Sequence, residues 1–283
     1  MFHRKMAFGG GWYPADREGC EREIESFRFS NLVNGCRGGC LGVVPHAGWI
    51  YSGRLAWGVF SNLMEPSGVD LVVVLGGHLG PGDPMVAMTE GEWDTPFGPF
   101  AIHTGFKEAL TGFEGVVLET EKRFSPDNSV ELQLPLAKYK YPDAELLPIR
   151  VPPGPEALRL GRELAGYLEA GSIRFVVVAS TDLTHYGPQY GFEPQGRGPA
   201  ALNWVKGEND PVFIRAVESG DGRSILASAR VHHNACSPGP VAALNEIAQA
   251  RGASFHTLEY TTSAEVAGED AANFVGYLAG VYL

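Results

Sequence analysis

The stretch Asp70-Leu71-Val72-Val73-Val74-Leu75-Gly76-Gly77-His78 decides the fold. Such an apolar, valine-rich run is typical of a strand buried on both faces of a parallel sheet. Two other apolar runs end in similar residues, one in Pro45-His46 and the other, Phe175-Val176-Val177-Val178-Ala179, in Ser180-Thr181-Asp182. Loops at the carboxyl ends of such strands converge on one crevice. We therefore expect two histidines and an acid to meet there, a set that can bind a metal with open coordination positions.

Strand and helix signals alternate along the chain and predict a single α/β domain over residues 1–283. We expect one mixed, mainly parallel sheet with helices on both faces. The predicted strands cover residues 40–45, 69–76, 85–88, 145–150, 174–180, 254–262 and 274–283. The predicted helices cover residues 17–27, 54–63, 106–110, 129–139, 155–170, 204–219 and 238–251. The last strand is apolar to the end, so it should be paired within the sheet.

The composition excludes several classes of function. A net charge of −11 argues against nucleic acid or an anionic membrane surface as the partner, because both bind clustered Lys and Arg. Residues 1–14 lack a signal peptide and no run is long enough to span a membrane, so we expect a cytoplasmic protein.

The cysteines Cys20, Cys36, Cys40 and Cys236 do not make a disulfide framework in a chain of 283 residues. Cys36 and Cys40 are spaced like half a zinc site, but no second pair follows, so we favour reduced thiols.

His46 and His78 lie in turns whose small residues let a ligand come close. Pro45 fixes the backbone before His46, and Ala47-Gly48 follows it. For His46 alone, a buried imidazole bonded to a carbonyl is the alternative. The glycine-rich turn around His78 is compatible with phosphate binding, yet it lacks the Lys and Ser or Thr of a P-loop. Nucleotide binding is therefore disfavoured.

Asp182, His185 and Cys236 are further candidates for chemistry. Asp182 is able to hold an imidazole, to bind metal or to cap the following turn. Cys236 precedes a predicted helix, whose positive end favours a thiolate that acts as ligand or nucleophile. A buried, inert thiol is the alternative for Cys236. In residues 127–135 we expect a helix start capped by Asn128 or Ser129.

Taken together, these segments resemble the Memo family (mediator of cell motility), whose microbial members are also called AmmeMemoRadiSam system protein B. The resemblance covers almost the whole chain and keeps the order of the motifs. The motifs are Gly11-Trp12-Tyr13-Pro14, Pro45-His46-Ala47-Gly48, Leu75-Gly76-Gly77-His78, Trp93-Asp94-Thr95-Pro96-Phe97-Gly98, Asn128-Ser129-Val130-Glu131-Leu132-Gln133-Leu134-Pro135, Ser180-Thr181-Asp182-Leu183-Thr184-His185-Tyr186-Gly187 and the segment around Cys236.

The resemblance implies a fold similar to that of class III extradiol ring-cleaving dioxygenases, with non-haem iron in the crevice. It implies that His46, His78 and Cys236 are the metal ligands. It also implies that Asp182 and His185 lie beside them and that Trp12 helps to line the pocket, where we also expect Asn128. Fe(II) is the expected metal, and copper or zinc are alternatives, because two imidazoles and a thiolate suit Cu(I), Zn(II) or a redox-active iron.

The chain departs from the family pattern at Asn128 and Gly77. The family commonly has a histidine where Asn128 stands, and an asparagine cannot shuttle a proton near neutral pH. If that histidine acts as an acid or base in relatives, the step is lost here or has moved to His185. An asparagine or serine usually stands at Gly77, so we expect looser support for His78.

The sequence leaves three functions open. The first is a metal-dependent, dioxygenase-like oxidoreductase acting on a small aromatic substrate, with Asp182 orienting a ligand or bound water and His185 as acid or base. The second is a non-catalytic module that binds a peptide or protein in an aromatic pocket around Trp12 and Trp49. Core packing is the alternative role for both tryptophans. The third is an accessory to AMMECR-type and radical SAM proteins, which only the family name implies.

Overall fold

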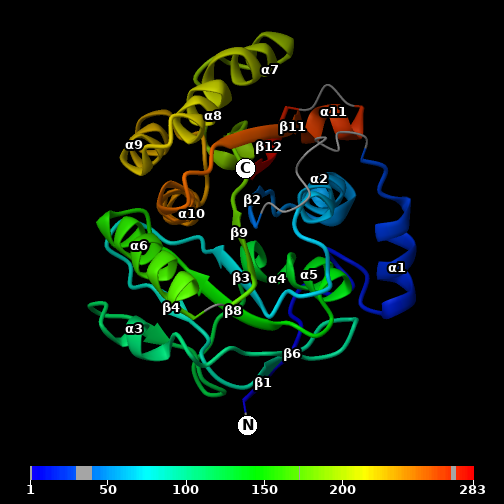
Figure 1. The fold of residues 1–283 in the computed structure, drawn as a ribbon. Helices are drawn as coiled ribbons and strands as arrows, with labels where there is room; N and C mark the ends of the chain where they lie inside the picture. Colours follow the sequence, from blue (N-terminus) through cyan, green and yellow to red (C-terminus); the bar gives the residue numbers. More distant parts are fainter. Residues whose placement is uncertain (1, 30–39, 172, 269–271) are drawn as a thin grey trace.

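The computed structural model describes residues 2–29, 40–171, 173–268 and 272–283 (Figure 1). Within them, one sheet holds nine strands, and β10, β12, β2, β9, β3, β8, β4 and β7 follow one another across it, with β11 paired to β12. The bounds are β2 (Leu41–Val44), β3 (Leu71–Gly76), β4 (Val86–Ala87), β7 (Val117–Leu118), β8 (Glu145–Arg150), β9 (Phe175–Ser180), β10 (His185–Tyr186), β11 (Phe255–Thr262) and β12 (Phe274–Tyr282). A small second sheet contains β1 (His3–Arg4), β5 (Glu92–Trp93) and β6 (Phe100–Ala101).

The centre of the main sheet is parallel. Strands β2, β9, β3 and β8 run in the same direction, with Leu41 opposite Val177 and Val72 opposite Val176. The terminal strand β12 is antiparallel to β2 on one side and to β11 on the other. The α/β class, the mixed and mostly parallel sheet and the pairing of the terminal strand are therefore confirmed.

Helices cover both faces of the sheet (Figure 1). Alternate residues of β3 enter different cores, because successive side chains of a strand point to opposite faces. Val73 and Leu75 pack in the core that includes the buried sides of α6 and α10, and Val72 and Val74 pack in the core under α2 and α5. The helices are α1 (Arg17–Ser26), α2 (Trp49–Asn62), α3 (Lys107–Thr111), α4 (Asn128–Glu131), α5 (Leu134–Lys140), α6 (Pro155–Ala170), α7 (Pro199–Trp204), α8 (Asp210–Glu218), α9 (Gly222–His232), α10 (Pro238–Ala250) and α11 (Ser263–Ala267).

Some predicted helices are wrong in extent. Helix α2 begins at Trp49, five residues before the expected start. Gly48, with a ψ of 145°, is the last residue outside the helix. The helix expected over residues 129–139 is divided into α4 and α5, and Pro135 lies in the first turn of α5, where its missing N–H is tolerated. A π-helical turn (Val205–Asn209) joins α7 to α8. Helix α9 was not predicted.

The loops that carry His46, His78 and Asp182 lie together at the carboxyl ends of the parallel strands. Strands β2, β3 and β9 are parallel neighbours, so Pro45-His46, Gly77-His78 and Thr181-Asp182 leave the sheet at the same edge. The thiol of Cys40 is buried, and Cys36 lies outside the described residues. Within the described part of the chain, every helix is too short or too polar to cross a membrane.

Candidate metal centre

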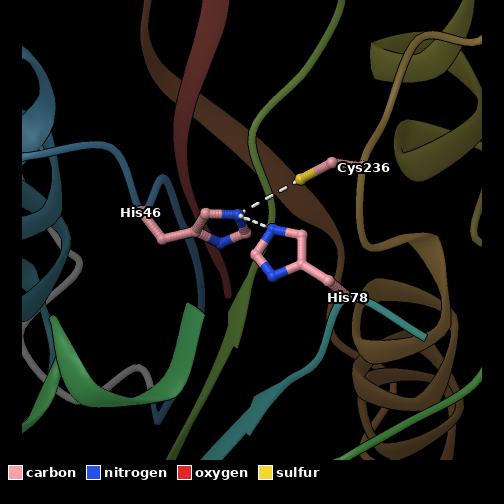
Figure 2. Close-up of side chains that lie close together, drawn as sticks. All are labelled: His46, His78 and Cys236. Atoms are coloured by element: carbon pink, nitrogen blue, oxygen red, sulfur yellow. Dashed lines mark hydrogen bonds between the residues drawn. The ribbon is translucent and has the colours of Figure 1, made fainter. Parts of the chain in front are cut away.

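His46, His78 and Cys236 lie together (Figure 2). Each offers one ligand atom, and these atoms all lie within 4.8 Å of one another. His46 Nε2 is 3.1 Å from His78 Nε2 and 3.2 Å from Cys236 Sγ. Ligand atoms around a tetrahedral ion are roughly 3.4 to 3.6 Å apart when the bonds are about 2.1 Å to nitrogen and 2.3 Å to sulfur. The spacing of the three atoms is close to that of ligands on a single ion.

The outer nitrogen of each imidazole is held by another side chain. His46 Nδ1 lies 2.8 Å from Ser180 Oγ, at the end of β9. His78 Nδ1 lies 3.4 Å from Asp127 Oδ1. Because an ionised carboxylate can only accept, His78 Nδ1 carries a proton there. Outer partners of this kind orient a metal-binding histidine and leave Nε2 for the ion.

Asp127 and His78 shift each other's pKa values. Burial acts to lower the pKa of His78, but hydrogen bonds and charge from Asp127 and Cys236 raise it to about 10. Burial acts to raise the pKa of Asp127, but His78 and Ser129 hold it well below its usual range. A metal ion that binds His78 Nε2 must therefore displace a proton, as is usual for imidazole ligands.

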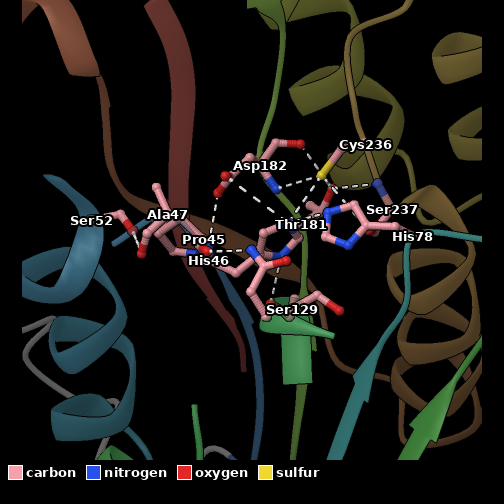
Figure 3. A network of polar contacts seen from close by, with 12 residues as sticks. Pro45, His46, Ala47, Ser52, His78, Ser129, Thr181, Asp182, Cys236 and Ser237 are labelled. Atoms are coloured by element: carbon pink, nitrogen blue, oxygen red, sulfur yellow. Dashed lines mark hydrogen bonds and ion pairs between the residues drawn. The ribbon is translucent and has the colours of Figure 1, made fainter. Parts of the chain in front are cut away.

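The Cys236 thiol is stabilised in its charged form. Burial acts to raise its pKa, yet the charge and hydrogen bond of His46 and the hydrogen bond of His78 lower it to about 6. The main-chain N–H of Asp182 also donates to Sγ at 3.3 Å (Figure 3). A thiolate at neutral pH suits a metal ligand. Two imidazoles and a thiolate fit a soft or borderline transition metal.

Asp182 fixes the chain around two of the three candidate ligands. Its Oδ1 accepts from the main-chain N–H of His46 at 2.7 Å, and its main-chain carbonyl accepts from Cys236 N at 3.1 Å. The carboxylate is buried, and burial raises its pKa, which His185 opposes. The capping alternative for Asp182 is wrong, because its carboxylate binds the loop of His46 instead of the turn that follows it.

His185 is held in one tautomer. Its Nδ1 lies 3.1 Å from the main-chain oxygen of Leu183. A carbonyl can only accept, so Nδ1 carries the hydrogen and Nε2 of the neutral ring is an acceptor. The ring of Tyr190 packs edge-on against the imidazole, with centroids 5.0 Å apart. His185 is therefore positioned to take a proton at Nε2.

A cavity of about 980 Å³ opens onto these groups. Its wall comes from the N-terminal segment, α1, the start of α2, the loops after β2, β3 and β9, the start of α4, β10 and the turn after it, α11, and β12 with the residue before it. The volume is at the upper end of the range for small-molecule sites. The wall includes the predicted residues Trp12, His46, His78, Asn128, Asp182 and His185.

The pocket assignment of Trp49 is wrong. Trp49 is 2% exposed and packs in the core between α2 and α5, where its Nε1 donates to the oxygen of Leu132 at 3.2 Å. It lies in the first turn of α2 and on its buried side, so its ring faces away from the cavity. Trp12 is 43% exposed and lines the cavity, as the sequence predicted.

Asn128 and Gly77, where the resemblance implies other residues, have structural roles. Asn128 lines the cavity and its Nδ2 donates to the carbonyl of His46 at 3.0 Å. The helix cap expected at Asn128 or Ser129 is instead Asp127, whose carboxylate accepts from Ser129 N. Gly77 has a φ of +116°, and a Cβ there would lie 2.7 Å from Arg150 Cβ. Asp127 contacts both the main-chain N–H and the ring Nδ1 of His78, so it positions this imidazole instead of residue 77.

The sequence reasoning missed the residues that hold the candidate ligands and the N-terminal wall of the cavity in place. These are Asp127, Ser180, Gln133 and Glu131, all buried. Gln133 Nε2 donates to the carbonyl of Pro45 at 2.9 Å, and Glu131 Oε1 accepts from Tyr13 OH at 3.0 Å. A signal was present in the sequence, because polar and apolar residues alternate from Ser129 to Gln133, and the structure buries all of them.

A family model described as Memo-like protein matches residues 4–281. The chain belongs to the Memo family. A MEMO1 family protein of Aeropyrum pernix is 31% identical to it over 282 residues, which are 95% of each chain. A MEMO1 family protein of Methanopyrus kandleri is 32% identical over 292 residues, covering 99% of this Memo chain and 98% of the relative. The family predicted from the order of the motifs is confirmed.

The fold of this Memo-family chain is also found in a solved structure. The crystal structure of an uncharacterized protein from Escherichia coli K12 aligns with a TM-score of 0.53 and 14% sequence identity. The alignment covers 85% of the Memo chain and 98% of the other. At this identity the likeness is one of fold alone.

Proposed function

We propose that this protein is a metal-dependent oxidoreductase of the dioxygenase type that binds Fe(II), or else copper, through His46, His78 and Cys236. One observation carries the proposal: two imidazole Nε2 atoms and a thiolate face the same point while both Nδ1 atoms are held by other side chains. Such an arrangement is typical of a metal site whose outer partners orient the ligands.

The donor set supports a redox-active ion or zinc. A bound iron or copper ion would supply redox chemistry with dioxygen and polarise an oxygen atom of the substrate, and zinc would supply only the second. His46, His78 and Cys236 would hold such an ion, and His46 and His78 line the cavity, so a substrate in the cavity would reach it. Iron is proposed first because of the fold that the family resemblance implies.

The other residues of the cavity wall have distinct roles in this proposal. Asp182 holds the main chain of His46 and so keeps that imidazole in place. His185 accepts a proton from a substrate hydroxyl at Nε2, because its Nδ1 is already bonded to Leu183. Asn128 holds the carbonyl of His46 and takes no part in proton transfer.

Metal analysis tests the ligand set. Purified protein is loaded anaerobically with Fe(II), and bound metal is measured in the wild type, His46→Ala, His78→Ala and Cys236→Ser. The matched control is His256→Ala, an exposed histidine on β11 outside the cavity. We expect about one ion per chain in the wild type and the control, and loss of most of it in each ligand variant. Unchanged stoichiometry in all three ligand variants would end the proposal.

Oxygen consumption tests the chemistry. With iron-loaded protein and simple phenols, His185→Ala should slow turnover by roughly 100-fold or more, since positioned proton transfer contributes about that much. Metal content should stay as in the wild type, because His185 is outside the ligand set. Consumption that is absent with every phenol would contradict the oxidoreductase proposal.

A peptide-binding module that performs no chemistry is the second candidate. The observation that favours it is the set of exposed aromatic side chains, Trp12, Tyr51 and Tyr190, on the cavity wall. Binding of a peptide without oxygen consumption would support this candidate. The AMMECR-type and radical SAM partners and the cytoplasmic location remain predictions of the sequence and the family name, and a pull-down from the native host tests the partners.

A further inference from the structure

The cavity wall carries a carboxylate that the proposed chemistry does not use. Glu23 of α1 lines the cavity and is partly buried. Among the described residues, neither a cation nor a hydrogen-bond donor pairs with this carboxylate, and burial raises its pKa. Holding a charged carboxylate away from water costs free energy, and a positive group beside it reduces that cost. Glu23 is therefore a ready partner for a positive group of a ligand.

The wall around Glu23 offers no positive charge in competition. Among the described lining residues there is no lysine or arginine, and the basic side chains are the histidines His46, His78 and His185. Burial and the charge of Asp182 raise the pKa of Tyr190 and of Tyr277, so these hydroxyls stay neutral near pH 7. Outside the metal centre, the wall combines neutral donors with a negative charge.

Large exposed side chains gather at the same cavity. Trp12 is 43% exposed, Ile50 79%, Tyr51 43% and Tyr190 40%, and all four line it. Exposed apolar side chains that cluster in this way mark ligand-binding surfaces. The faces of tryptophan and tyrosine rings also attract cations. The wall therefore matches a ligand that has both a ring and a positive charge.

We propose that the cavity binds an aromatic amine, with its ammonium group at the Glu23 carboxylate and its ring among Trp12, Tyr51 and Tyr190. This inference names a ligand class for the proposed function. It rests on that function in placing the end of the ligand opposite the ammonium group near His46 and His78. A phenol hydroxyl at that end would meet the proton acceptor His185 Nε2. Phenolic amines are the members of the class that carry both an ammonium group for Glu23 and a hydroxyl for His185.

Binding of three matched probes tests the inference. Tyramine, 4-ethylphenol and 4-hydroxyphenylacetate share a phenol ring and differ in the charge of the short side chain. Calorimetric titrations use full-length protein both without added metal and after loading with iron. We expect tyramine to bind about tenfold more tightly than 4-hydroxyphenylacetate, with 4-ethylphenol between them, since a partly buried charge pair contributes about 1 kcal/mol, or roughly five- to tenfold in affinity.

Substitutions in α1 test whether Glu23 causes the preference for tyramine. Glu23→Gln should weaken tyramine about five- to tenfold and leave 4-ethylphenol unchanged within about twofold. Glu25→Gln is the control, because Glu25 is exposed on the same helix and does not line the cavity. Tighter binding of the carboxylate probe, equal effects of the two variants, or no binding of any probe at millimolar concentration would each overturn the inference. Metal stoichiometry, measured separately, reports on the proposed function, so the two failures are distinguishable.

Discussion

Asp127 contacts His78 at two points. Its Oδ2 accepts from the main-chain N–H of His78 at 3.2 Å, and its Oδ1 lies 3.4 Å from the ring Nδ1. The same carboxylate caps α4 by accepting from Ser129 N at 3.0 Å. One side chain therefore joins the end of β3 to the start of α4 and fixes the imidazole between them.

Asp127→Asn should weaken metal binding without unfolding the protein. Asparagine caps a helix about as well as aspartate but lacks the charge that pairs with His78, so the free energy of unfolding should fall by only about 1 to 3 kcal/mol. Loss of the charged partner of His78 Nδ1 should lower metal affinity by roughly 10- to 100-fold. Competition with a fluorescent chelator measures the affinity. Asp221→Asn, which changes the cap of α9 outside the site, serves as control, and an equal affinity in both variants would contradict the role of Asp127.

The two tryptophans assigned to the pocket by sequence should differ in their effect on stability. Trp49 is 2% exposed and Trp12 is 43% exposed. Trp49→Ala should cost about 3 to 5 kcal/mol of the free energy of unfolding, the usual effect of removing a buried tryptophan. Trp12→Ala should cost less than about 1 kcal/mol. Urea unfolding measures both, and similar losses in the two variants would show that the assignment to core and cavity is wrong.

Glu131→Ala should loosen the N-terminal wall of the cavity. Glu131 Oε1 accepts from Ala7 N at 2.6 Å, from Phe8 N at 2.8 Å and from Tyr13 OH at 3.0 Å. Leaving these donors unpaired should cost about 3 kcal/mol or more, since each buried unpaired group costs about 1 to 3 kcal/mol. Glu131→Gln keeps an oxygen acceptor and should cost much less. Urea unfolding together with limited proteolysis near residues 7–13 is the measurement, and two equally stable variants would argue against this anchoring.

Asp210 should make stability depend on pH. Its Oδ2 accepts from Tyr260 OH at 2.7 Å and its Oδ1 accepts from Thr184 N at 3.1 Å. Burial raises its pKa from the ordinary 3.8 to about 6, although these hydrogen bonds act to lower it. The folded state therefore binds more protons than the unfolded state between about pH 4 and 6, and stability falls as the pH rises through this window by roughly 3 kcal/mol.

Asp210→Asn removes this titration and resembles the protonated acid in shape. Relative to the wild type, the variant should gain roughly 3 kcal/mol of unfolding free energy between pH 4 and pH 7. Urea unfolding of both proteins at several pH values measures the difference. A difference that stays constant with pH would show that Asp210 is not the group responsible.

The parts of the fold that could be predicted are those with strong local patterns. Strands β3 and β9 are continuous apolar runs, and both were predicted to within two residues of their observed bounds. Helix α9 was missed because its sequence mixes polar and small residues, and its stability comes from packing against α8 and α10. Local pattern carries little information about such a helix.

The candidate ligands could be predicted because each lies just beyond an apolar strand or before a helix. The residues that hold them could not, because the contacts join distant parts of the chain. Ser180 reaches His46 across 134 positions, and Asp127 reaches His78 across 49. The tryptophans show a related difficulty, since Trp12 and Trp49 look alike in sequence and only the start of α2 decides that Trp49 is buried.

The spacing of the ligand atoms has a consequence for metal selection. His46 and Cys236 are already in place, since Asp182 holds both of their loops, so the chain has little freedom to reshape itself around one particular ion. For the proposed site, the affinities of two imidazoles and a thiolate for divalent ions would follow the Irving–Williams order, in which copper outcompetes iron. The ion bound at the proposed site in the cell would then depend on the supply of free metals around the protein.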